Sequence, residues 1–188
     1  RSFFVLDSLQ GEDLTQIKII FLGAGRLIRG MLGPKIQALG HKVILLEMLS
    51  DQTTARIVSQ KGRYQVVETF SDGHKNILEV GNVAAAGSLE DPAVRIKIHR
   101  ILRKTSEKEI LIPFGVTERG IVEGSPAIQE LTEMLESYYQ GHHGNASFEQ
   151  ARLLILNTDN VSKNGDLIRR YVLKEAEKKS AAFAQWIE

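Results

Sequence analysis

The chain has 188 residues, of which 43% are hydrophobic and 25% charged, a balance typical of a globular domain with a substantial core. Its formal net charge of +1 favours neither nucleic acid nor a membrane surface as partner. Cysteine is absent, which excludes disulfides, thiolate metal sites and a cysteine nucleophile. No apolar run approaches the roughly 20 residues of a membrane-spanning helix, and the N-terminus lacks a signal-peptide pattern. We therefore expect a soluble, cytoplasmic protein.

Residues 1–16 are expected to form a lead-in, and the first informative segment follows directly. An apolar run of strand length at 17–22 leads into a glycine turn and then into helical periodicity. A dinucleotide-binding unit begins in this way, because the first glycine permits a tight turn and the second lets backbone approach a pyrophosphate. The residues predicted to hold the phosphates are Gly23, Ala24, Gly25, Arg26 and Leu27. Ile28 stands where a third glycine is usual, and an ordinary strand-to-helix turn fits the loop equally well.

Further strands and helices alternate along the rest of the chain. The predicted strands cover residues 17–22, 41–47, 63–68, 77–83, 109–116 and 152–157. The predicted helices cover residues 27–39 with a break at Gly33-Pro34, then 51–60, 91–102, 125–139 and 165–179. This order predicts a doubly wound, mostly parallel Rossmann-type α/β sheet with helices on both faces. A small hairpin insertion is expected near residues 63–83, so that one dinucleotide-binding domain spans residues 17–188.

Glu47 ends the second predicted strand, close to the offset of about 20 residues at which an acidic side chain binds the adenosine ribose. A carboxylate there accepts hydrogen bonds from the ribose hydroxyls and repels a 2′-phosphate, so the cofactor predicted is NAD rather than NADP. The alternative is a solvated glutamate at a strand end. Arg26 and Arg29 would contact phosphate or, equally, lie on the helix surface.

Other polar segments carry weaker signals. Residues 117–120 and 158–165 each follow a strand, at the edge where α/β sheets bind ligands, but such residues are also routine turn formers. His142 and His143 are expected at a flexible loop tip, and no metal site is predicted. The basic segment 95–104 is expected to be a helix with one buried stripe and a solvated face, so no nucleic-acid partner is predicted.

In order along the chain, these motifs resemble the polyol-specific long-chain dehydrogenases of the mannitol dehydrogenase family. The segments that carry the resemblance are Phe21–Gly25 with Arg29–Gly30, Val116–Gly120, and Leu156–Gly165 with Ala184–Glu188. The stretch from Asp159-Asn160 to Asn164-Gly165 is the most specific, and it looks more like the mannitol 2-dehydrogenase and fructuronate reductase branch than the mannitol-1-phosphate branch.

The resemblance implies hydride transfer between NAD(P)H and a polyol, keto sugar or sugar acid, without zinc. It places Thr117 and Glu118 near the nicotinamide, and Asn160 as a hydrogen-bond donor to the reacting oxygen. Asn164 is a weaker candidate for the same neighbourhood. The family's catalytic lysine belongs to a C-terminal helical domain, so residues 1–188 alone are expected to bind the dinucleotide without catalysing the reaction. A non-catalytic NAD-sensing module is the alternative.

Overall fold

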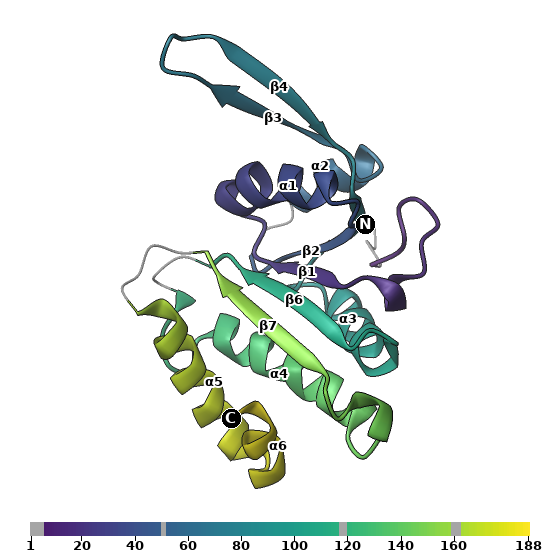
Figure 1. Ribbon diagram of the computed structural model, residues 1–188, viewed down its shortest axis with the longest axis vertical. Helices are drawn as coiled ribbons and strands as arrows, with labels where there is room; N and C mark the ends of the chain where they lie inside the picture. Colours follow the sequence, from purple (N-terminus) through teal and green to yellow (C-terminus); the bar gives the residue numbers. More distant parts are fainter. Residues whose placement is uncertain (1–5, 50–51, 117–119, 159–162) are drawn as a thin grey trace.

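The computed structural model describes residues 6–49, 52–116, 120–158 and 163–188. Within them, a parallel sheet runs in the order β5-β2-β1-β6-β7. Its strands are β1 (Ile19–Leu22), β2 (Val43–Glu47), β5 (Val83–Ser88), β6 (Glu109–Phe114) and β7 (Arg152–Asn157). An antiparallel hairpin of β3 (Tyr64–Thr69) and β4 (Lys75–Val80) projects from the body of the molecule (Figure 1). The doubly wound fold and the hairpin insertion are therefore confirmed.

Helices cover the sheet on both faces. One face carries α1 (Gly33–Ala38) and α2 (Gln52–Ser59), and the other carries α3 (Pro92–Lys104), α4 (Pro126–His142), α5 (Asn164–Lys179) and α6 (Ala181–Ile187) (Figure 1). Shorter turns are η1 (Leu14–Gln16), the π-helical η2 (Ile28–Leu32) and η4 (Ala146–Phe148). No helix among the described residues combines the length and apolar character needed to cross a membrane.

The strands β1 and β2 form where the sequence predicts them because their apolar runs are buried on both faces of the sheet. Helix starts follow their capping residues: Asp91 Oδ1 accepts a hydrogen bond from Ala93 N (2.8 Å), and Ser125 Oγ accepts one from Ile128 N (3.4 Å). The lead-in is packed onto the body, since Leu6 is fully buried and Leu9 N donates to Ala84 O (2.7 Å).

Several details differ from the prediction. The hairpin strand expected over 77–83 ends at Val80, and Val83 begins β5, an edge strand that the pattern did not indicate. The helix expected to end at Tyr139 continues to His142, and α6 adds a further helix. β5 carries no strand signal in the sequence because alanine and glycine have low strand propensity. Its pairing with β2 and packing against α3 require small side chains: a Cβ on Gly87 would lie 2.9 Å from Val94.

The prediction that His142 lies at a loop tip is wrong, because α4 continues through this residue. His142 is buried in the last turn of α4, with Nδ1 2.7 Å from Tyr138 O and Nε2 2.8 Å from Thr105 O. His143 is exposed. The basic segment behaves as predicted, because Val94, Ile98 and Leu102 are fully buried along one stripe of α3.

Candidate dinucleotide-binding edge

The carboxyl ends of four strands meet at one edge of the sheet. Gly23 follows β1, Glu47 ends β2, Gly115 follows β6 and Thr158 follows β7. The order of the strands reverses between β1 and β6, because β2 and β5 lie on one side of β1 while β6 and β7 lie on the other. Open α/β sheets bind ligands in the crevice at such a reversal. The topology thus makes the turn after β1 the centre of the candidate site.

Gly23 is fixed by backbone contacts on both sides. Its N–H donates to Leu46 O at the end of β2 (2.8 Å), and its φ of +101° is one that side chains rarely adopt. A Cβ at this position would lie 2.5 Å from Gly115 O, which is closer than any real contact. Only glycine therefore allows the turn after β1 to lie against the end of β6.

The contact between Ile28 and Gly115 explains why the helix needs no third glycine. Ile28 is 1% exposed, and a Cβ on Gly115 would lie 2.1 Å from its Cδ1. The space that a glycine on the helix usually provides is provided here by Gly115 on the neighbouring strand. Gly115 also belongs to the candidate site. It falls inside the strand predicted over 109–116, but β6 ends at Phe114, so that this glycine directly follows the strand.

The outer part of the loop is open. Gly25, Arg26 and Leu27 are exposed, and among the described residues a Cβ on Gly25 would meet only Gly115 O, at 3.8 Å. Ala24 is buried, and its carbonyl oxygen accepts a hydrogen bond from Arg29 Nε (2.6 Å). Arg29 therefore holds the middle of the loop through a backbone contact, while Gly25 leaves a free approach to the first turn of the helix.

A π-turn over η2 shapes the helix that follows. In this turn Gly33 N donates to Ile28 O, five residues earlier. The next residue, Pro34, has no N–H to continue the pattern to Arg29 O, and the Tyr64 hydroxyl donates to that oxygen instead (3.0 Å). Burial raises the pKa of Tyr64 to about 12, with a smaller opposing effect of the Arg29 charge. The base of the hairpin thus fixes the helix at the break predicted for Gly33-Pro34.

Glu47 lies on the strand next to the glycine turn. It directly follows Leu46, which accepts the Gly23 hydrogen bond, and its own carbonyl accepts one from Leu89 N (2.8 Å). The side chain is half-buried. Its backbone is therefore fixed between the turn after β1 and the turn after β5, in the position that the spacing in the sequence predicts.

The residues expected on the substrate side are described only in part. Thr117, Glu118 and Asn160 lie outside the described residues. Asn164 is the first residue of α5, after Lys163 in a left-handed conformation (φ +53°). Nearby, Thr158 N and Oγ1 both donate to Phe114 O (3.2 and 3.3 Å), which joins the ends of β7 and β6.

These features define the class of the protein: a Rossmann-type α/β domain with a glycine turn at the reversal of its sheet. The chain belongs to the mannitol dehydrogenase family, because the family model described as the mannitol dehydrogenase Rossmann domain matches residues 17–188. The resemblance found in the sequence is confirmed. No individually curated protein matches the chain.

Two solved structures share its fold. One is a D-sorbitol dehydrogenase in substrate-free form, with 15% sequence identity and a TM-score of 0.69. The other is the Pseudomonas fluorescens mannitol 2-dehydrogenase in a ternary complex with NAD and D-mannitol, with 17% identity and a TM-score of 0.72. Each similarity covers 99% of this chain, but only 43% and 42% of the respective structure. The chain thus spans less than half the length of these relatives.

Proposed function

We propose that the chain is the NAD-binding part of a dehydrogenase that transfers hydride between a nicotinamide cofactor and a polyol, keto sugar or sugar acid. The observation that carries the proposal is the fixed position of Gly23 against Gly115 at the reversal of the sheet, with Glu47 on the next strand. Family membership supports the reaction class. The exposed, uncrowded Gly25 satisfies the requirement for close approach of a pyrophosphate to backbone.

Each residue of the edge has a separate task. The turn from Gly23 to Leu27 would bind the pyrophosphate with the N–H groups of the first helical turn. Arg29 would keep this turn in place through Ala24 O. The Glu47 carboxylate would accept hydrogen bonds from the adenosine ribose hydroxyls, and its charge would disfavour the 2′-phosphate of NADP.

The substrate side of the proposal comes from the family motifs. Thr117 and Glu118 would lie beside the nicotinamide, and Asn160 would donate a hydrogen bond to the reacting oxygen as negative charge develops on it. Asn164 would support the same region as a weaker contributor. A bound nicotinamide supplies the hydride acceptor or donor at its C4 atom. The proton would be exchanged by the lysine that the family carries in its second domain.

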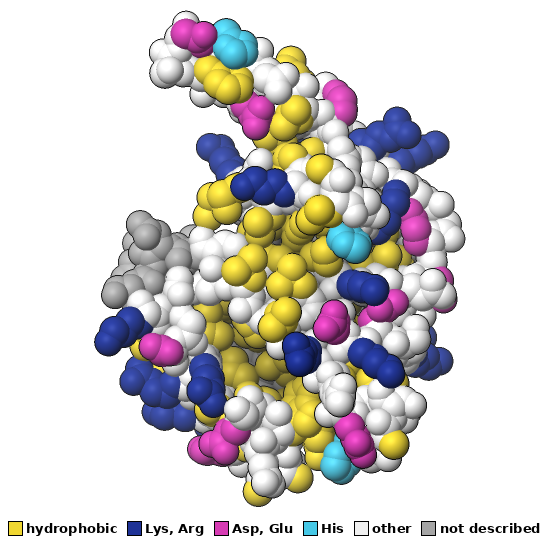
Figure 2. Space-filling view, viewed as in Figure 1, with side chains coloured by type: hydrophobic (Ala, Val, Ile, Leu, Met, Phe, Trp, Pro, Cys, Tyr) yellow, Lys and Arg dark blue, Asp and Glu magenta, His cyan; other side chains and the backbone are white. Residues whose placement is uncertain are grey.

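An uncovered part of the sheet supports the presence of a second domain. Leu154 and Leu156 on β7 are 58% and 42% exposed, and Figure 2 shows hydrophobic side chains gathered on this side of the molecule. Parallel sheets are normally covered on both faces, so these leucines are suited to contact with further protein. We propose that the substrate-binding domain packs there.

The cofactor proposal is tested by titrating the protein with NADH and with NADPH and following the fluorescence of the dihydronicotinamide. We expect NADH to bind at least tenfold more tightly, and Glu47→Gln to reduce this preference. Glu68→Gln is the matched control, because Glu68 is an exposed carboxylate on the hairpin. Preferential binding of NADPH, or an unchanged preference in Glu47→Gln, would remove the role given to Glu47.

The reaction is tested on the full-length protein by following NADH formation with mannitol, sorbitol and related polyols, and NADH consumption with keto sugars and hexuronates. Turnover of at least one of these compounds is expected. Tight NADH binding without turnover of any of them would instead indicate a non-catalytic NAD-sensing module.

A further inference from the structure

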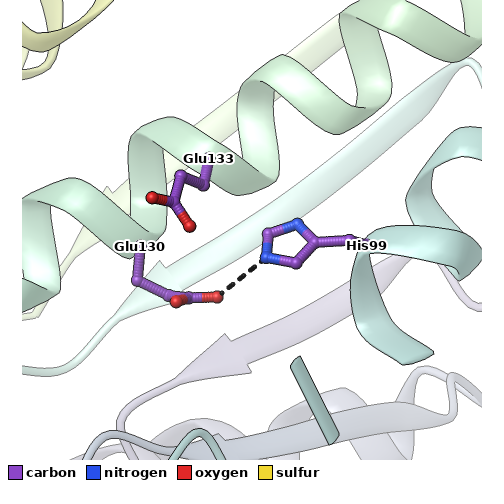
Figure 3. Close-up of side chains that lie close together, drawn as sticks. All are labelled: His99, Glu130 and Glu133. Carbon is purple, nitrogen blue, oxygen red and sulfur yellow. Dashed lines mark ion pairs between the residues drawn. The ribbon is translucent and has the colours of Figure 1, made fainter. Parts of the chain in front are cut away.

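Three ionisable side chains converge between α3 and α4, away from the glycine turn. His99 comes from α3, and Glu130 and Glu133 lie one turn apart on α4 (Figure 3). One potential ligand atom from each residue lies within 4.8 Å of the other two. The Glu130 side chain is 1% exposed, whereas Glu133 is 42% exposed. The cluster is therefore buried at one end and open to solvent at the other.

The two oxygens of Glu130 have different surroundings. Oε2 accepts hydrogen bonds from Arg95 Nε (2.8 Å) and Nη2 (2.6 Å). Oε1 lies 3.2 Å from His99 Nε2, at ion-pair distance, and this buried oxygen accepts no hydrogen bond from the described residues. One buried oxygen of Glu130 thus faces the imidazole, while the other is held by the Arg95 guanidinium.

The imidazole of His99 is oriented from its other side. Nδ1 lies 2.9 Å from Ser137 Oγ, which leaves Nε2 directed into the cluster. The order Ser137, His99, Glu130 resembles a hydrolase relay, but Ser137 is 3% exposed, so no substrate reaches its hydroxyl. In metal sites, by contrast, a ligating histidine holds an outer partner with its second nitrogen, and ligating carboxylates are hydrogen-bonded in turn. Ser137 and Arg95 occupy those outer positions.

We propose that His99, Glu130 and Glu133 bind one divalent transition-metal ion of the zinc type. Imidazole and carboxylate are ligands that zinc accepts, and tetrahedral bonds of about 2.1 Å separate neighbouring ligands by about 3.4 Å. Nε2 and Oε1, 3.2 Å apart, already match this spacing. Glu133 completes the set by a rotation on its exposed side, and solvent takes the fourth position. Two carboxylates and one guanidinium leave a net charge of −1, which favours binding of a cation.

The ion would join α3 to α4 and would take no part in the reaction at the dinucleotide-binding edge. The proposal does not depend on the proposed function, since all of its residues lie in the interface of these two helices. The sequence predicts no metal site because His99 and the two glutamates are far apart along the chain. They come together only where α3 packs against α4.

The test is a calorimetric titration of chelator-treated protein with Zn²⁺, and a second titration with Co²⁺ followed by its visible absorption. We expect one equivalent of each ion to bind, with a rise in Tm that a chelator reverses. Glu133→Gln and His99→Gln should weaken binding at least tenfold. Glu133 is exposed, so its variant keeps the test valid if His99→Gln fails to fold.

Glu177→Gln is the matched control, because Glu177 is an exposed glutamate on α5 and its variant changes the net charge equally. Its affinity for Zn²⁺ should stay within twofold of the wild-type value. No saturable binding of one equivalent, or equal affinities of Glu133→Gln and Glu177→Gln, would overturn the proposal and leave an ion-pair network between the two helices.

Discussion

Gly23 and Gly25 lie two residues apart but are required for different reasons, and substitution by alanine separates them. Within the part of the chain that the structure describes, a Cβ on Gly25 would meet only Gly115 O, at 3.8 Å, which is an ordinary contact. We therefore expect Gly25→Ala to change the free energy of unfolding by no more than about 0.5 kcal/mol. Because the methyl group would stand where backbone approaches the pyrophosphate, the affinity for NADH should fall at least tenfold, or about 1.4 kcal/mol.

Gly23→Ala should act on the fold itself. Its Cβ would lie 2.5 Å from Gly115 O, at a φ of +101°. A strained backbone conformation of this kind costs about 1–3 kcal/mol, which corresponds to a decrease in Tm of roughly 2–12 °C for a domain of this size. The loss of NADH affinity should accompany this loss of stability.

The assay combines thermal unfolding followed by circular dichroism with NADH titration of each variant. Gly30→Ala is the control, because among the described residues its Cβ would meet no atom within 4 Å outside its own helical turn, and neither property should decrease. Wild-type affinity for NADH in Gly25→Ala would refute the reasoning. An equal loss of Tm in Gly25→Ala and Gly23→Ala would refute it as well, since the two positions would then not differ in packing.

Two further predictions concern the contacts that hold the turn and its helix. Gly115→Ala should destabilise the protein by roughly 1–3 kcal/mol in urea denaturation, because its Cβ would lie 2.1 Å from Ile28 Cδ1. Ile28→Val removes that atom and should recover part of the loss; equal losses in both backgrounds would contradict the packing argument. The raised pKa of Tyr64, about 12 against 10.0, means that the unfolded chain loses the tyrosine proton first, so stability should fall as pH rises from 10 to 12. Tyr64→Phe should make this fall shallower, and an unchanged slope in alkaline unfolding would contradict it.

Patterns that depend on neighbouring residues could be predicted from the sequence, and contacts between distant segments could not. The apolar runs of β1 and β2 and the Asp91-Pro92 helix start are local signals, and the structure contains all three elements. β5 has no such signal, because it is a strand only by virtue of its pairing with β2 and its close packing against α3. The burial of His142 likewise depends on a carbonyl at Thr105, from the end of a different helix.

The residues of the candidate site likewise fall into those that local sequence patterns predict and those that depend on distant contacts. The spacing from the glycine turn predicts Glu47, because two adjacent parallel strands and one helix fix the number of residues between their ends. Gly115 and Tyr64 act through contacts with residues far away in the sequence. Gly115 lies against Gly23 and Ile28, and Tyr64 donates a hydrogen bond to Arg29 O. Their importance follows only from the packing of the helix against its neighbours.

The position of Ile28 shows what the third glycine of the dinucleotide-binding pattern is for. That glycine serves the close packing of the helix against the neighbouring strand. Here the strand contributes the space at Gly115 and the helix contributes a fully buried isoleucine, so the contact keeps its closeness and gains apolar burial. The two glycines that remain in the turn cannot be exchanged in this way, because Gly23 is constrained by its own φ and Gly25 leaves open the approach to the helix. In this chain the helix can therefore pack closely after a turn with two glycines, because Gly115 follows the facing strand.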